Sequence, residues 1–259
     1  MTSFAVSANA YDRFMGRYSA PLAPLFADFA GVEAGQRVVD VGCGPGALVA
    51  ELIDRAGAAS VSAVDPSESF VEAVRERHPG VEARQAAAEE LPFPDGSFDA
   101  ALAQLVVHFM NDPVAGLAEM ARVTRADGLV AACVWDHATG GRGPLSLFWQ
   151  AARELEPDIA GEARLAGTGE GDLAKLLEAA GVRDVEDAVL ILSVEHESFE
   201  DWWEPYTYGV GPVGAYVAAL EPERRDRLRD GCRALLPPAP FSLEVRAWAA
   251  RGRPGSSDA

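Results

Sequence analysis

The stretch Arg37-Val-Val-Asp-Val-Gly-Cys-Gly-Pro-Gly-Ala47 decides the fold of this chain. The valines Val38, Val39 and Val41 form a β-branched run that ends in glycines at alternate positions, a pattern typical of a buried strand stopping at a tight loop. Apolar residues then recur at helical spacing over 48–56. The pattern predicts a strand, a glycine loop and a helix whose N-terminus lies over the strand end.

The glycines Gly42, Gly44 and Gly46 let a backbone turn sharply and let a ligand lie against the main chain. We expect free amides and the positive end of the helix to face that ligand, which indicates a nucleotide cofactor. Asp40 lies two residues before the first glycine, where a carboxylate is costly unless loop amides or a cationic ligand group pair with it. Gly42-x-Gly44-x-x-Ala47 also fits the relaxed dinucleotide fingerprint, so an NAD(P)-dependent oxidoreductase stays open.

Two strings carry a family resemblance. Residues 38–46, Val-Val-Asp-Val-Gly-Cys-Gly-Pro-Gly, resemble motif I of the class I S-adenosylmethionine-dependent methyltransferases. The string Ala-Ala-Glu-Glu-Leu-Pro-Phe at 87–93 resembles the adenine-binding segment of small-molecule methyltransferases, where Asp-Ala-Glu-x-Leu-Pro-Phe is usual. The acid of that segment is replaced by Ala87. The resemblance then implies that adenine is bound by the backbone of Ala88 and Glu89 and by apolar contacts such as Leu91.

Asp65 ends a predicted second strand over 61–65, and Pro66 begins the following helix. An acid about twenty residues beyond a glycine loop is suited to accept hydrogen bonds from both ribose hydroxyls. A helix cap is the alternative role, but it leaves the spacing unexplained. We expect Asp65 and Pro66 to contact the cofactor.

The fourth and fifth predicted strands bring further polar residues to the same edge. Active sites of parallel sheets lie beyond the carboxyl ends of the strands, which places Gln104 and His108 near the methyl donor. His108 is the candidate general base, although a histidine among apolar neighbours is also a common core residue. His137, after the fifth strand, is expected in the acceptor pocket, and His196 is a further base candidate.

The first thirty residues read as one or two amphipathic helices ahead of the sheet. In methyltransferases that this chain resembles, a Tyr-x-x-x-Met-Gly-Arg stretch closes over the methionine end of the cofactor. The resemblance brings Tyr11 and Arg17 to the cofactor, whereas an ordinary packing helix is the alternative.

A long connection, 198–240, precedes the last predicted strand. Connections of this length are usually functional or disordered, and its many aromatic residues argue against disorder. We expect a substrate cap whose pocket is lined by Trp202, Trp203, Tyr206 and Tyr208. Packing of some of these rings on the core is the alternative.

The charge and cysteine content limit partners and compartment. Lys and Arg number 22 against 40 Asp and Glu, a net charge of −18 that repels nucleic acid and anionic membranes and favours a neutral or cationic small substrate. Three widely spaced cysteines fit no zinc spacing, so we expect no metal and a reducing cytoplasmic setting. The N-terminus lacks a signal-peptide pattern, no long apolar run suggests a membrane span, and nothing indicates the oligomeric state.

These observations predict an α/β chain with one domain over 1–259. We expect a Rossmann-like, seven-stranded, mostly parallel sheet with helices on both faces and an antiparallel last strand. Lid helices occupy 1–30, the cofactor core 36–135 and the cap 198–240. The resemblance implies methyl transfer from S-adenosylmethionine to a small molecule by in-line displacement. A non-catalytic regulatory protein that binds S-adenosylmethionine or another small ligand is the alternative from a different functional class.

Overall fold

The computed structural model of this chain describes residues 8–138, 140–159 and 161–255. Its strands are β1 (Val38–Val41), β2 (Val61–Asp65), β3 (Glu82–Gln85), β4 (Phe98–Gln104), β5 (Thr124–Trp135), β6 (Arg183–His196) and β7 (Phe241–Arg253). Its α-helices are α1 (Ala8–Tyr11), α2 (Arg17–Ala30), α3 (Ala47–Ala56), α4 (Glu68–Arg77), α5 (Pro113–Val123), α6 (Ser146–Leu155), α7 (Asp172–Ala179), α8 (Phe199–Trp203), α9 (Gly211–Ala219) and α10 (Pro222–Leu235). Shorter turns are η1 (Asp12–Gly16), η2 (Ala58–Ser60), η3 (Val107–Phe109) and η4 (Glu204–Tyr208).

The strands form one seven-stranded sheet in the order β3-β2-β1-β4-β5-β7-β6. β1 to β5 pair in parallel, whereas β7 is antiparallel to both β5 and β6. The predicted fold class and the antiparallel last strand are therefore confirmed. Asp40 of β1 lies opposite Ala63 of β2 and Leu102 of β4, so the carboxyl ends of these strands lie at one edge of the sheet.

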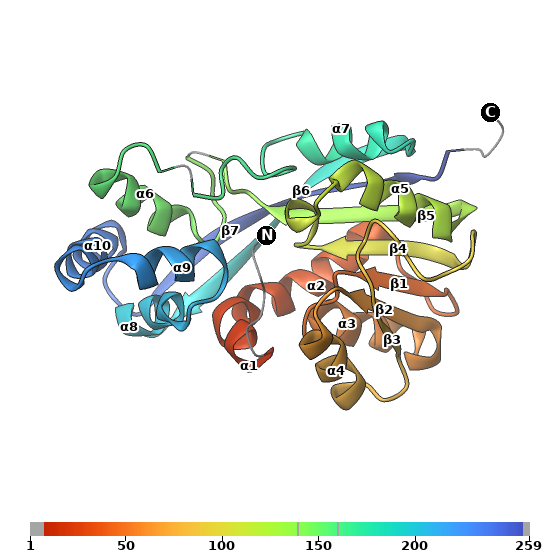
Figure 1. The fold of residues 1–259 in the computed structure, drawn as a ribbon, viewed down its shortest axis with the longest axis horizontal. Coiled ribbons are helices and arrows are strands. Elements are labelled where there is room, and N and C mark those ends of the chain that lie inside the picture. The colour runs from red at the N-terminus through yellow and green to blue at the C-terminus, as the bar shows by residue number, and fades with distance from the viewer. Residues whose placement is uncertain (1–7, 139, 160, 256–259) are drawn as a thin grey trace.

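Both faces of the sheet are covered, which explains why β1 is apolar at nearly every position. Val38 belongs to one core cluster together with Leu22 of α2 and Leu52 of α3. Val39 belongs to a second cluster together with Leu117 of α5. Figure 1 shows α5 and α7 on one face of the sheet and α2, α3 and α4 on the other. Alternate side chains of one strand thus fill two separate cores.

The connection between β6 and β7 forms α8, η4, α9 and α10 rather than an irregular loop. Figure 1 shows these helices gathered with α6 at one end of the molecule, and α10 packs on α6. The predicted N-terminal helices are present from residue 8, and residues 1–7 of the expected lid lie outside the described residues. Within the part of the chain that the structure describes, no helix has the length and apolar character needed to span a bilayer.

Candidate active site

A cavity of about 720 Å³ lies at the carboxyl ends of β1, β2 and β4. Cavities of this size accommodate nucleotide-sized cofactors. The residues predicted to bind cofactor or act as base that line it are Tyr11, Gly42, Gly44, Asp65, Pro66, Ala88, Glu89, Gln104 and His108. The edge at which parallel strands end therefore brings together most of the predicted site.

The glycine loop gives the cavity a surface without side chains, but its first amides are not free to donate to a ligand. Gly42 has φ +75°, and a Cβ there would lie 2.3 Å from a methyl group of Val106. The expectation of free amides is wrong for the first part of this loop. The amides of Gly42 and Cys43 donate to the carbonyl oxygen of Val64 at 2.7 and 3.0 Å. The amide of Gly44 donates to the carboxylate of Asp65 at 2.9 Å.

Asp65 links the glycine loop to the start of α4. Its Oδ2 accepts from the amide of Gly44, and its Oδ1 accepts from the amide of Ser67 at 2.8 Å. Burial raises the pKa of Asp65 to about 6, while these two N–H groups oppose that rise. Each carboxylate oxygen offers two acceptor sites, so both keep capacity for a ligand hydroxyl.

Asp40 is 1% exposed, and neither of its carboxylate oxygens has a hydrogen-bond partner among the described residues. Burial and the neighbouring charge of Asp65 raise the pKa of Asp40 to about 8. It does not line the cavity, and neither does Gly46, which ends the loop with φ +102° against His78. The structure therefore places Asp40 and Gly46 behind the surface that a ligand would contact.

The segment after β3 forms another wall of the cavity, through Ala86, Ala87, Ala88 and Glu89. The Glu89 carboxylate accepts from two amides at the N-terminus of α5, those of Asn111 at 2.7 Å and Asp112 at 3.1 Å. Both hydrogen bonds end on Oε1, so the side chain of Glu89 is anchored to the start of α5.

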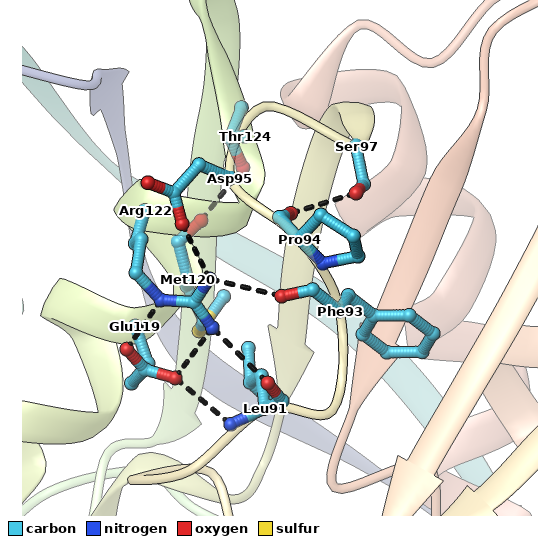
Figure 2. Close-up of polar contacts among 9 residues, drawn as sticks. All are labelled: Leu91, Phe93, Pro94, Asp95, Ser97, Glu119, Met120, Arg122 and Thr124. Carbon is cyan, nitrogen blue, oxygen red and sulfur yellow. Dashed lines mark hydrogen bonds and ion pairs between the residues drawn. The ribbon is translucent and has the colours of Figure 1, made fainter.

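The end of this segment is held by α5, as Figure 2 shows. The Arg122 guanidinium donates to the carbonyl oxygens of Phe93 at 2.9 Å and Leu91 at 3.0 Å. Glu119 orients that guanidinium at 2.6 Å and accepts from the Leu91 amide at 2.9 Å. Leu91 itself packs in the core and does not line the cavity, contrary to the expected adenine contact. Arg122 thus fixes the segment without reaching the cavity.

A second cavity, of about 30 Å³, adjoins the first and shares Tyr11 and His108 with it. His137 lines this smaller cavity. Burial, and then His137, hold the pKa of His108 well below its ordinary value, and burial lowers the pKa of His137 to about 4. The Nδ1 atoms of both rings are buried without a hydrogen-bond partner among the described residues. Both histidines are therefore neutral at pH 7 and able to accept a proton.

Gln104 is oriented by the N-terminal helix: its Nε2 donates to the carbonyl oxygen of Ser19 at 3.1 Å. Its Oε1 is buried and has no partner among the described residues.

The structure does not bring Arg17 to the cavity. Its guanidinium binds both carboxylate oxygens of Asp201, at 2.9 and 2.6 Å, and lies 2.9 Å from Nδ1 of His196. His196 also stacks on Phe241, away from both cavities. Arg17, which the resemblance assigned to the cofactor, is instead paired with Asp201 on α8.

The expected acceptor pocket of cap aromatics is wrong. Trp202, Trp203 and Tyr206 are 2%, 6% and 2% exposed and belong to the apolar core. Their rings pack on one another and on Phe148 of α6, because the connection folds into helices that need a core of their own. Tyr208 packs under the guanidinium of Arg13 and also does not line either cavity.

Other residues of the cap take that place. Val210, Gly211, Pro212 and Val213 line the smaller cavity together with Glu162. None of these residues is predicted from the sequence as a site residue. Glu162 lies in an irregular stretch between α6 and α7 with no periodic pattern. A buried acid in such a stretch gives no local signal.

Comparison with known proteins identifies the core of the chain. Residues 39–132 match the family model described as "Methyltransferase domain". An uncharacterised methyltransferase of Mycobacterium tuberculosis is 37% identical over 134 residues, 52% of each chain. A demethylmenaquinone methyltransferase of Renibacterium salmoninarum is 34% identical over 117 residues, 45% of this chain and 48% of that protein. The chain thus matches about half the length of these curated relatives.

The fold extends beyond that match. The crystal structure of the YcgJ protein from Bacillus subtilis aligns with a TM-score of 0.59 and 20% identity, over 91% of this chain and 98% of that one. At this identity the likeness concerns the fold alone.

Proposed function

Because residues 39–132 belong to the methyltransferase domain family, in its class I S-adenosylmethionine-dependent form, we propose that this protein transfers a methyl group from S-adenosylmethionine to a small-molecule acceptor. The observation that carries the proposal is the cavity of about 720 Å³ at the strand ends, where Asp65 and the side-chain-free surface of Gly42 and Gly44 meet. A carboxylate beside bare backbone suits a nucleoside whose ribose hydroxyls need acceptors.

The described residues fit such a donor. Phe70, Val106 and Met110 give the cavity apolar walls for a flat base, beside the backbone of Ala88 and Glu89. Asp65 on the cavity wall suits a ligand that carries positive charge, because a cation stabilises its ionised form. Tyr11 closes the cavity from the N-terminal side.

The bound sulfonium supplies an already activated methyl group. The chain itself must align an acceptor in line with that group and exclude water. Where the acceptor holds a proton, His108 or His137 is placed to receive it, because both rings are neutral, His108 lines both cavities and His137 lines the smaller one. No charged catalytic side chain is needed.

The lining of the cavities supports a small acceptor that is not an anion. Neither lysine nor arginine occurs among the described residues that line them. Demethylmenaquinone methyltransferase, one of the relatives, is named for a small-molecule substrate. The net charge of −18 disfavours nucleic acid as a partner. Three free, buried cysteines suit a reducing cytoplasmic setting.

Calorimetric titration with S-adenosylmethionine, S-adenosylhomocysteine and NAD tests the proposal. We expect the first two to bind and NAD not to bind, because Asp65 and the loop backbone suit a single nucleoside. Binding of NAD alone would overturn the assignment in favour of an oxidoreductase.

A non-catalytic ligand-binding role is the second candidate, since Ala87 on the cavity wall lacks the acid usual in the family segment it resembles. Incubation with methyl-labelled S-adenosylmethionine and cell-extract metabolites separates the two. Tight binding of the donor without label transfer to any metabolite would favour the regulatory role.

A further inference from the structure

The smaller cavity lies against the larger one and differs from it in character. At about 30 Å³ it has room for one small polar group, since a single water needs on the order of 10–15 Å³ by the same measure. Tyr11, Phe14, Phe109 and Trp135 contribute aromatic rings to it. It is the natural place for the head group of an acceptor that lies beside the bound donor, because the two cavities share Tyr11 and His108.

One acidic side chain, Glu162, lines this aromatic cavity, and it is 3% exposed. Its Oε2 accepts a hydrogen bond from Nε1 of Trp149 at 2.8 Å, and no Arg, Lys or His side chain forms an ion pair with it among the described residues. Burial raises the pKa of Glu162 to about 7, while the bond from Trp149 opposes that rise. A glutamine would accept the same hydrogen bond without the cost of burying an acid, so Trp149 does not account for the carboxyl group.

The charges around the cavity all favour a cation. His108 and His137 are neutral at pH 7 for the reasons given above. Neither cavity is lined by lysine or arginine among the described residues, whereas Asp65 and Glu162 supply carboxyl groups. The faces of aromatic rings attract an ammonium, and a buried carboxylate gains its missing counter-charge from the same group. An anionic head group would find no cationic side chain among the described residues that line either cavity.

We propose that Glu162 determines acceptor specificity by binding the protonated amino group of a small basic amine in the aromatic cavity. This inference rests on the proposed function, because the amine is a methyl acceptor only if the protein transfers methyl groups. Binding of the amine can nevertheless be measured without turnover. Glu162 holds the ammonium from one side, and the rings of Tyr11, Phe14 and Trp135 surround it.

The test uses matched probes on protein saturated with S-adenosylhomocysteine. Butylamine, 1-butanol and butyrate share an apolar body and differ in head group, and ligand-observed NMR titration measures their dissociation constants. We expect butylamine to bind at least about tenfold more tightly than 1-butanol at pH 8, and butyrate not to bind, because hydrogen bonds to charged groups exceed neutral ones.

The Glu162→Gln variant keeps an acceptor for Trp149 and removes the charge. It should bind butylamine and 1-butanol alike, with S-adenosylhomocysteine affinity unchanged. The exposed Glu170→Gln is the matched control and should keep the amine preference. Butylamine binding no better than 1-butanol to the wild type, or an undiminished preference in Glu162→Gln, would overturn the proposal.

A pH series on the unmutated protein tests the role of Glu162 even if the variant does not fold. Butylamine remains protonated throughout pH 6–8, so its affinity should fall about tenfold from pH 8 to pH 6 as Glu162 takes up a proton. The pKa values of His108 and His137 lie below this window and that of Tyr11 above it, whereas Asp65, with a pKa of about 6, and Asp40, with a pKa of about 8, titrate at its edges. The same series on Glu162→Gln, which keeps both aspartates, measures their share of the decline, and only the remaining decline is assigned to Glu162. A flat profile would contradict the role of Glu162. Failure of S-adenosylhomocysteine to bind at all would instead reject the proposed function.

Discussion

Arg17 and Asp201, 184 residues apart in the chain, form a bidentate ion pair in which Nη1 and Nη2 of the guanidinium lie 2.9 and 2.6 Å from the two carboxylate oxygens. The pair joins α2 to α8 and so ties the N-terminal helices to the connection between β6 and β7. Each of these two segments contributes to the lining of the smaller cavity, through Phe14 and Val210 among others. The ion pair is therefore placed to set the distance between those walls.

Arg17→Met should lower the free energy of unfolding by about 1–2 kcal/mol, a value reduced for the partial exposure of both side chains. The hydrogen bonds from Arg17 lower the pKa of Asp201, so this stability is present above pH 4 and is lost as pH falls further. Urea denaturation at pH 7 and pH 3 measures both effects. Lys175→Met, which breaks an exposed pair with Asp172, is the control and should change little. Equal losses in the two variants would show that the Arg17 pair is an ordinary surface contact.

Asp65→Ala should weaken binding of S-adenosylhomocysteine about 10- to 100-fold, because charge-assisted hydrogen bonds are worth roughly 1.5–3 kcal/mol. With a pKa of about 6, the wild-type carboxyl group is protonated at pH 5, so wild-type affinity should also fall between pH 8 and pH 5. Calorimetry gives both values. Thermal unfolding without ligand is the control, since the same carboxylate accepts from Gly44 and Ser67. Unchanged affinity in a folded variant would exclude a ribose contact.

Ala87→Asp should tighten binding of S-adenosylhomocysteine by about tenfold, since Ala87 lines the cavity and a carboxylate there could accept from the adenine amino group. Ala87→Asn is the matched variant with a neutral acceptor and should gain less. Equal or weaker affinity of the Asp variant would show that the base lies elsewhere along the 86–89 wall.

Asp40→Asn should stabilise the ligand-free protein at pH 8. The folded pKa of Asp40, about 8, lies above its unfolded value, so its contribution to stability is complete below pH 4 and lost as pH rises to 8. We expect a gain of about 1–3 kcal/mol, less than full linkage because the new amide is also buried. Denaturation between pH 5 and pH 8 should show a shallower decline in the variant, and the exposed Glu76→Gln should follow the wild type. A decline as steep as that of the wild type would mean that Asp40 is ionised in the folded state.

Tyr206→Ala should cost about 3–5 kcal/mol of stability, the range for removing a buried aromatic ring. Tyr206→Phe should cost less than about 1 kcal/mol, because the hydroxyl makes one long hydrogen bond, 3.4 Å, to the carbonyl oxygen of Pro144. Urea denaturation compares them. If Tyr206→Ala kept wild-type stability and lost acceptor binding, Tyr206 would line the acceptor pocket and the packing role would be wrong.

Elements whose signals are local could be predicted from the amino-acid sequence. The valines and glycines of 37–47 specify a strand that stops at a turn, and the α/β alternation specifies a parallel sheet. Asp65 was identified because strand ends meet at one edge, so its place along the chain implies its place in space.

Which side chains face the cavities depends on tertiary packing, which local sequence patterns do not reveal. Arg17 was assigned to the cofactor because nothing local to it reveals Asp201, and Trp203 was assigned to a pocket because an aromatic helix has the same pattern on a core or on a cavity wall. Nothing local to Glu162 indicates a site, because the residues that line the smaller cavity with it, such as Phe14 and Val210, lie far away in the sequence. Strand and helix periods are fixed by the backbone, whereas the direction and partner of a long side chain depend on which distant segments pack against it.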